Sequence, residues 1–410
     1  MSVEASTTDG AEKAAPAVSR RWIVAYVLAM VGVAAGWFGP IQILLPAQSA
    51  RFAGDGGKEL ALAMVTAYGA LVALVANPLW GVVSDRVPSR WGRRRPVFLA
   101  GTAVGVVGLV VLGVATDVAW MTVGWVIVQL GLSGPLAALA AMIADGVPER
   151  QRGLVGSLFG VAQTLGVVAG TAVAVLAGEG SIGYFALAIA VPALGVALML
   201  QAEAPTPPRP PGALAAGFAR GLRPSRDFVW AWIVRLLLNL VNALVILYLY
   251  YFLADGVGVD EPGTWVLILT LVNVLVAATV ASVGGVLSDR WQRRRAFVVV
   301  GAVVLAGGSI VMALVPNTTA VLVATVLIGV GWGAYVSVDM AIMTQVLPAE
   351  GTRATMLGVA NVASALPQVL APVLAAPVVT MLGGYPSLYG AVAVIALLAL
   401  VALSRVRSIT

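Results

Sequence analysis

The sequence contains no cysteine and no histidine among its 410 residues. The absence of cysteine excludes disulfide bonds, thiolate metal ligands and cysteine nucleophiles. The absence of histidine removes the commonest metal ligand and the side chain that usually carries protons near neutral pH. Any proton chemistry in this chain must therefore use carboxylates, and we expect no metal site and no cofactor.

Charged residues are also scarce, at 10% of the chain, whereas 60% of the residues are hydrophobic. A soluble domain carries about 25% charged residues, so this composition predicts a membrane protein in contact with lipid. The net charge of +6 does not indicate nucleic-acid binding. The arginines form short clusters between apolar runs rather than one basic face, and we expect no nucleic-acid partner.

Twelve apolar runs are long enough to cross a bilayer, which takes roughly 20 residues in a helix. A barrel would show short alternating segments instead. We therefore expect an all-α membrane protein with twelve transmembrane helices. The predicted spans lie near residues 22–46, 59–83, 96–115, 118–144, 153–177, 183–201, 228–253, 263–287, 296–315, 319–346, 354–380 and 386–404.

The basic residues predict the orientation of the chain. All except Arg51, Lys58 and Arg235 fall in segments that share one side of the membrane with the N-terminus. The positive-inside rule therefore predicts that both termini are cytoplasmic. Residues 1–20 are polar and carry acidic side chains, unlike a secretory signal, and we expect a disordered cytoplasmic tail there and a second tail at 405–410.

An arginine-rich turn occurs twice in the sequence. GVVSDRVPSRWGRRRP at 81–96 follows the second span, and a reduced copy, GVLSDRWQRRR, lies at 285–295 after the eighth. A parallel six-plus-six repeat accounts for this recurrence. We expect two pseudo-symmetric six-helix bundles, at 21–201 and 228–404, joined by a cytoplasmic linker rich in proline and arginine at 202–227.

The first copy of this turn carries the pattern G-x-x-x-D-R-x-x-x-R-x-G-R, which resembles the cytoplasmic signature of the major facilitator superfamily. Its residues are Gly81, Asp85, Arg86, Arg90, Gly92 and Arg93, and the second copy keeps Asp289, Arg290 and Arg293. The form SDRVPSRWGRRRP is similar to that of sucrose/proton symporters and of glycoside, pentoside and hexuronide transporters. Gly36-Trp37 and LGVANVASALPQ at 357–368 favour the same group.

The resemblance implies the major facilitator fold, with spans one, four, seven and ten around a central cavity. It also implies a cytoplasmic gate, in which Asp85 with Arg86 and Arg93 latches the second span against the eleventh. The alternative is that these arginines only set the topology.

Two charged residues lie well inside the predicted spans, Arg235 and Asp339. At ~1.5 Å per residue, both sit about 10 to 15 Å from the cytoplasmic ends of their helices, so an ion pair is possible. Charges at membrane depth usually mark substrate or ion pathways. We expect Asp339 to exchange a proton and thereby release or capture Arg235. A purely structural clamp is the alternative.

Amides and aromatic residues share faces on several predicted helices. Arg235, Asn239 and Asn242 recur at i, i+4 and i+7 in the seventh span. Amides beside aromatic rings suit a polar ligand with apolar ring faces, such as a sugar. For each single amide the alternative is a bridge between neighbouring helices. The predicted substrate-binding residues are Trp37, Gln42, Trp125, Gln129, Asn239, Asn242, Trp332 and Tyr335.

These features predict a monomeric secondary active transporter, not an enzyme, since no residues suggest a catalytic triad or metal site. We expect it to move a small polar organic solute, with a sugar or glycoside favoured, across the inner membrane by alternating access. Protons are the expected coupling ion. Two alternatives are a proton-coupled exporter of drugs or secondary metabolites, and a membrane receptor or scaffold that does not transport.

Overall fold

The computed structural model describes residues 17–86, 89, 92–201, 224–347 and 353–407. Within these ranges twelve helical segments are long and apolar enough to cross a membrane, as the sequence predicts. The first bundle contains α1 (Arg20–Gly39), η1 (Pro40–Leu44), α2 (Leu45–Ala53), α3 (Lys58–Arg86), α4 (Arg94–Val114), α5 (Val118–Gly146), α6 (Glu149–Leu176) and α7 (Ser181–Met199). The second contains α9 (Arg226–Leu247), α10 (Leu249–Tyr251), η2 (Phe252–Val257), α11 (Pro262–Trp291), α12 (Arg294–Leu314), α13 (Thr318–Gln345), α14 (Arg353–Met381) and α15 (Gly384–Ser404).

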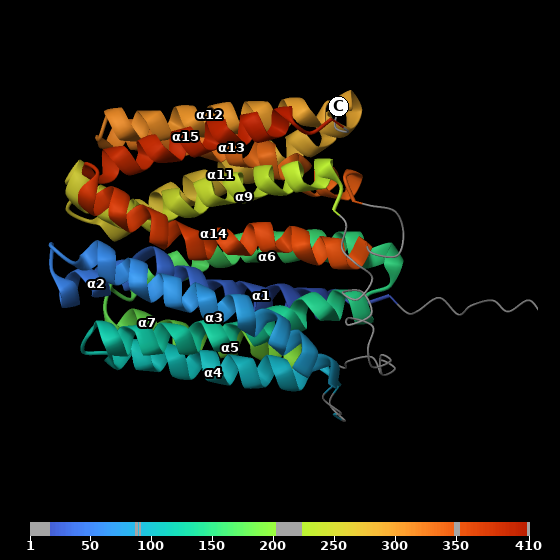
Figure 1. Cartoon of the computed structure of the whole chain (residues 1–410). Helices are drawn as coiled ribbons and strands as arrows, with labels where there is room; N and C mark the ends of the chain where they lie inside the picture. Colours follow the sequence, from blue (N-terminus) through green and yellow to red (C-terminus); the bar gives the residue numbers. More distant parts are fainter. Residues whose placement is uncertain (1–16, 87–88, 90–91, 202–223, 348–352, 408–410) are drawn as a thin grey trace, which may run out of the picture.

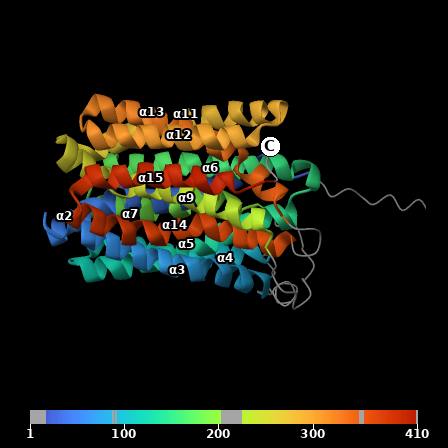
Figure 2. The ribbon, with the colours of Figure 1, turned by 45° about the horizontal axis from the view of Figure 1, so that its top comes forward.

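The two bundles lie side by side with their helices running in roughly the same direction (Figures 1 and 2). Helices α4 and α5 lie at one side of the molecule, and α12 and α13 lie at the other. Between them, α3 packs against α14 and α6 packs against α11. The surface between the bundles is therefore formed largely by these four helices.

The fourth spans of the two bundles begin in the same way, at positions 200 residues apart. Asp117 accepts a hydrogen bond from the Trp120 amide (2.9 Å) and caps α5. Asn317 caps α13 in the same way, by accepting from the Ala320 amide (2.8 Å). A short polar side chain at this position satisfies an amide that the first turn leaves unpaired. The same local chemistry thus starts the fourth span of each bundle.

Glycines allow the third and fourth spans of each bundle to approach closely. A Cβ on Gly131 of α5 would lie 2.2 Å from the Gly105 amide nitrogen of α4, so no larger residue fits. In the second bundle, a Cβ on Gly331 of α13 would lie 2.7 Å from the carbonyl oxygen of Gly301 in α12. Helices in lipid associate through such close van der Waals packing, because lipid offers no hydrophobic drive.

The first and seventh spans are longer and less regular than the sequence predicts. After Gly39 the first continues through the π-helical turn η1 and through α2 to Ala53. Gln48 in α2 is buried, and two hydrogen bonds satisfy its amide. It donates to the Leu112 carbonyl (2.9 Å) and accepts from the Tyr184 hydroxyl (2.8 Å). The seventh span bends at Tyr248 and ends in η2, where Gly258 adopts the left-handed conformation.

Candidate transport site

The two bundles are joined by polar contacts at one end of the molecule. We call it the closed end; it carries Lys58 at the start of α3. Lys58 Nζ lies 2.8 Å from Asp255 Oδ2 of the opposite bundle, and the Tyr251 hydroxyl donates to the Pro46 carbonyl (2.9 Å). The opposite end, which holds Arg86, Arg94 and both described chain termini, is called the arginine-rich end (Figure 1). Among the described residues, no hydrogen bond or ion pair joins the bundles there.

A cavity of about 270 Å³ lies between the bundles. Its lining comes from α1, α3, α5 and α6 of the first bundle and from α9 and α14 of the second. The described lining includes five side-chain amides and no charged residue. The polar and indole-bearing residues that line it are Trp37, Thr66, Asn77, Gln129, Gln163, Asn242 and Gln368.

Within this cavity, Trp37 and Gln129 form a fixed pair. The Trp37 indole nitrogen donates to Gln129 Oε1 at 2.6 Å, across α1 and α5. The bond orients the indole and leaves the Gln129 amide nitrogen available as a donor. An aromatic face beside an amide donor is suited to a ligand that is apolar on one face and polar at its edge.

Arg235 of α9 and Asp339 of α13 form the ion pair that their predicted depths permit. Arg235 Nη1 lies 3.0 Å from Asp339 Oδ2, and both side chains are largely buried. The Tyr335 hydroxyl donates to Asp339 Oδ1 (2.6 Å), and Asn239 donates to the Arg235 carbonyl (2.8 Å). A void of about 10 Å³ beside the pair has room for no more than about one water molecule.

The same guanidinium contacts a helix that lines the cavity. Arg235 Nε donates to Ser364 Oγ of α14 at 2.8 Å. Gln368 follows Ser364 by four residues, so both occupy one face of α14, and Gln368 lines the cavity. The serine that binds the Arg235 guanidinium therefore lies one helical turn from a residue of the cavity wall.

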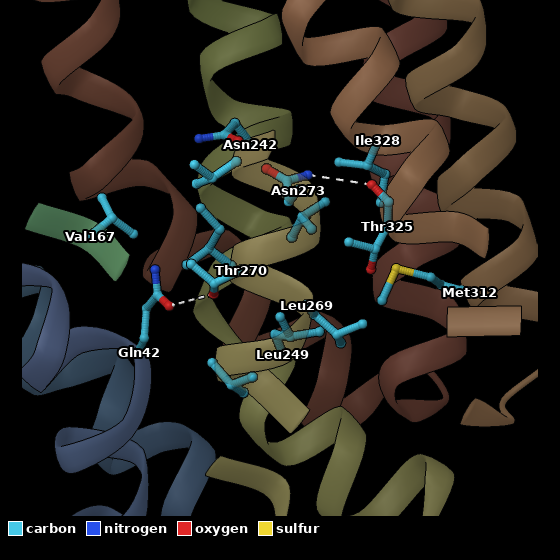
Figure 3. Close-up of a pocket in the computed structure, with 14 residues that line it drawn as sticks. Gln42, Val167, Asn242, Leu249, Leu269, Thr270, Asn273, Met312, Thr325 and Ile328 are labelled. Atoms are coloured by element: carbon cyan, nitrogen blue, oxygen red, sulfur yellow. Dashed lines mark hydrogen bonds between the residues drawn. The ribbon is translucent and has the colours of Figure 1, made fainter. Parts of the chain in front are cut away.

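Figure 3 shows the residues that line a second, smaller cavity of about 80 Å³. Asn242 and Ile246 line both this cavity and the larger one. Gln42 reaches it from the first bundle, and its Oε1 accepts from the hydroxyls of Thr171 (3.1 Å) and Thr270 (3.0 Å). Gln42 therefore joins the two bundles rather than lining the larger cavity.

Several residues predicted to bind substrate lie elsewhere. Trp125 is fully buried between α5 and α3, where a Cβ on Gly69 would lie 2.3 Å from its indole nitrogen. Trp332 packs against Tyr335 with ring centroids 5.5 Å apart, and neither lines the cavity of 270 Å³. Of the predicted set, the structure brings Trp37, Gln129 and Asn242 together there. Helical spacing identified the polar faces, but it does not tell which face meets the cavity.

Four polar lining residues were not predicted: Thr66, Asn77, Gln163 and Gln368. They belong to α3, α6 and α14, whereas the family resemblance implies a cavity lined by the first, fourth, seventh and tenth spans. Asn77 and Gln163 are amides at membrane depth. Because a polar group there costs free energy unless it faces the protein interior or a cavity, their positions in the sequence could have indicated the cavity.

The arginine-rich turn is held within its own bundle. Arg94 is buried, its Nη2 lies 2.8 Å from Asp85 Oδ1, and its Nε donates to Asp145 Oδ2 (2.8 Å). Arg93 Nη2 also approaches Asp145, at 3.4 Å. Gly92 has a φ of +93°, a conformation that favours glycine. Asp85 is therefore bound to α4 in this state, whereas Arg86 is exposed and a Cβ on Gly81 would meet no atom within 4 Å.

The second copy repeats this arrangement more loosely. Arg294 Nη1 donates to Gln345 Oε1 (3.2 Å), the counterpart of Asp145 200 residues on, and its Nη2 lies 3.9 Å from Asp289. Arg290 and Arg293 are exposed. Arg90, predicted for the first copy, lies outside the described residues. Arg94 and Arg294 were not among the predicted gate residues, although they occupy matched positions in the repeat.

The twelve spans define a multi-pass membrane protein, and comparison with known families shows its class. The family model for the Major Facilitator Superfamily matches residues 53–372 and 264–409. The chain belongs to this superfamily, whose members are transporters rather than enzymes.

Several relatives resemble parts of the chain. The general alpha-glucoside permease of Schizosaccharomyces pombe is 23% identical over 190 residues, which cover 42% of this chain and 34% of the permease. Sucrose transport protein SUC4 of Arabidopsis thaliana is 33% identical over 104 residues, 25% of this chain and 19% of the relative. The matches span about a third or less of the relatives' own length.

Solved structures share the fold over almost the whole chain. The nucleoside transporter NupG aligns with a TM-score of 0.76 at 12% identity, covering 94% of this chain and 100% of that one. The peptide transporter POT in complex with sulfate gives a TM-score of 0.76 at 17% identity, covering 96% and 97%. At these identities the likeness concerns the fold alone.

Proposed function

We propose that this protein is a proton-driven secondary transporter of a small neutral polar solute, with a sugar or glycoside favoured. It acts as a monomer surrounded by lipid in the inner membrane. Its arginine-rich end and both termini face the cytoplasm, as the positive-inside rule requires. The state with a closed Lys58 end is then the inward-facing one, and transport proceeds by rocking of the two bundles about the cavity.

The observation that carries the substrate class is the uncharged, amide-rich lining of the cavity between the bundles. Five amides supply donors and acceptors, and Trp37 supplies an aromatic face. A charged substrate would need an opposite charge in the wall to offset its desolvation. The described lining offers none, which favours a neutral polyol over the organic cations that a drug exporter would carry. The partial likeness to proteins named as sucrose transporters and an alpha-glucoside permease supports the same class.

Proton coupling is assigned to Asp339. When Asp339 is ionised it holds Arg235, and protonation of the carboxylate would weaken this pair and free the guanidinium to strengthen its contact with Ser364. Because α14 carries both Ser364 and Gln368, the protonation state of Asp339 changes the wall of the cavity. Arg235 and Asp339 thus couple the proton to the solute without touching it.

Uptake into proteoliposomes tests the substrate class and the coupling ion together. Radiolabelled sucrose, an alkyl glucoside, a neutral nucleoside and a lipophilic cation are offered with and without an imposed pH gradient. We expect accumulation of a sugar or glycoside that collapses when a protonophore is added. Gradient-driven transport of the cation alone would contradict the proposed substrate class. Accumulation that ignores the protonophore would contradict proton coupling.

A further inference from the structure

The cavity proposed to bind the solute shares two residues of its wall with the smaller cavity of about 80 Å³ (Figure 3). These residues, Asn242 and Ile246, are four apart and lie on one face of α9. The two cavities therefore meet at one turn of α9, and a ligand held there can reach into both. Gln42 and Val167 line the smaller cavity from the first bundle, and its other described lining residues belong to the second.

The smaller cavity is predominantly apolar. Nine of its fourteen described lining residues have aliphatic or thioether side chains. Three of its five polar side chains are already paired: Thr270 donates to Gln42 Oε1 (3.0 Å), and Asn273 Nδ2 donates to the Thr325 carbonyl (3.4 Å). An alkyl group that fills this space breaks neither bond, and its removal from water is favourable.

Asn242 is the polar residue at the junction of the two cavities. Its side chain is half-buried and makes no hydrogen bond with another described residue. The amide therefore keeps its donors and its acceptor for a ligand. On the side of the larger cavity, Gln129 and the Trp37 indole supply the amide donor and the aromatic face that suit a sugar ring.

The volume of the smaller cavity limits what can enter it. A cavity of ~150 Å³ holds benzene, with its six carbons. At about half that volume, 80 Å³ has room for an alkyl group of about three carbons. An aromatic ring is too large, and so is a second sugar ring, whose hydroxyls would also need polar partners.

We propose that the smaller cavity is a subsite for a short alkyl aglycone, which makes a small alkyl glycoside the preferred solute. The sugar ring lies against the amides of the larger cavity, and the alkyl group enters the smaller one. Asn242 donates to the oxygen that links them. The inference rests on the proposed function in placing a sugar in the larger cavity, and it adds the chemical group that the second cavity selects.

Binding of matched glycosides to the purified protein in nanodiscs tests this inference. The probes are methyl, n-propyl and phenyl glucosides and the corresponding galactosides, and the rise in melting temperature gives the dissociation constant of each. For the transported sugar, the n-propyl compound should bind about fifteenfold more tightly than the methyl compound, from about fourfold for each buried methylene. The phenyl compound should bind more weakly than the n-propyl compound, because its ring exceeds the volume of the subsite.

Three variants locate the effect in the smaller cavity. Val274→Phe fills it from α11 and should remove the n-propyl advantage while methyl glycosides bind as in the parent, because Val274 does not line the larger cavity. Val283→Phe makes the same change at an exposed position of the same helix and should behave like the parent. Met312→Ala enlarges the cavity and should raise the affinity for the phenyl compound relative to the methyl compound.

Equal affinity for the methyl and n-propyl compounds in the parent would overturn the inference, as would an n-propyl advantage that persists in Val274→Phe. Tighter binding of the phenyl than of the n-propyl compound in the parent would overturn the assigned size. In each of these cases, binding of the methyl compound would leave the proposed sugar transport standing. If no glycoside stabilises the parent protein, the proposed substrate class fails and the subsite fails with it.

Discussion

Arg235 Nη1 and Asp339 Oδ2 lie 3.0 Å apart in the second bundle, and Nε of the same guanidinium donates a hydrogen bond to Ser364 of α14. The pair is thus connected to one of the helices that line the cavity between the bundles. Breaking a buried pair by removing one partner leaves an uncompensated charge and costs about 3–5 kcal/mol. Removing both charges avoids that penalty.

Arg235→Gln and Asp339→Asn should therefore each lower the melting temperature of the purified protein, because each leaves one buried charge unpaired. The double variant should lose less stability than the sum of the two single variants, because neither charge is left alone. Thermal unfolding of the four proteins in one detergent measures this coupling. Strictly additive losses would show that the two charges do not interact in the folded protein.

The bond between Trp37 and Gln129 gives a prediction for substrate affinity. Gln129→Met removes the acceptor of the indole hydrogen and the amide donor together, and an unsatisfied buried group costs about 1–3 kcal/mol. Apparent affinity for the transported solute should fall by about tenfold or more. Trp125→Phe is the matched control, because Trp125 is buried away from the cavity and its indole nitrogen has no hydrogen-bond partner among the described residues. Similar losses of affinity in both variants would contradict this assignment.

The space around two glycines predicts that a Gly→Ala substitution destabilises the protein at one position and not at the other. Gly131→Ala places a methyl group against the backbone of α4 and should destabilise the fold by about 1–3 kcal/mol. Gly160→Ala in α6 meets no atom within 4 Å and should leave the melting temperature unchanged or raise it. Thermal unfolding of both variants is the measurement. Equal stabilities would show that close approach of α4 and α5 is not needed.

Asp85 gives a prediction about the cytoplasmic gate. In the described state it is paired with Arg94 of its own bundle, whereas the latch that the family resemblance implies would hold the arginine-rich end closed against α14 in the other state. Asp85→Asn removes both of these contacts. We expect the latch to outweigh the pair with Arg94, so the population should shift toward the open arginine-rich end, by up to about tenfold for the ~1.5 kcal/mol of a charged hydrogen bond. A shift in the opposite direction would show that the pair with Arg94 is the stronger contact. Spin labels at Arg150→Cys and Ala296→Cys report the separation of the bundles there.

Asp289→Asn is the weaker counterpart of this change, because the Asp289 side chain is 77% exposed and an exposed charge contributes little to either state. It should shift the same label separation less than Asp85→Asn does. An unchanged population and transport rate in Asp85→Asn would leave the arginines with the topological role alone.

The sequence was sufficient to predict the twelve spans, because length and apolarity in a helix are local properties. The depth of Arg235 and of Asp339 was also predictable, since it follows from counting residues. The partner of Asp85 was not, because Arg94 is one of three consecutive arginines and only packing buries it rather than its neighbours. Likewise, Trp125 and Gln129 lie one turn apart on the same face of α5, and only the packing shows that Gly69 of α3 covers Trp125 whereas Gln129 meets the cavity.

The closed end could not have been predicted from spacing either. Pro46 and Lys58 of the first bundle lie far in the sequence from Tyr251 and Asp255 of the second, which they contact. Their meeting depends on the conformational state, because the bundles touch at this end only when it is closed. A sequence describes both states of an alternating transporter equally, whereas one structure describes the contacts of a single state.

The most direct test of the account is transport by Asp339→Asn in proteoliposomes, measured on one preparation as proton-driven accumulation and as solute counterflow. Counterflow exchanges solute without net proton movement, so it also reports whether the variant is folded and can bind the solute. We predict that accumulation is lost while counterflow persists, because the amide introduced by this substitution can neither take up a proton nor hold Arg235 by charge. Accumulation at the level of the parent protein would contradict the assignment of Asp339 as the coupling residue.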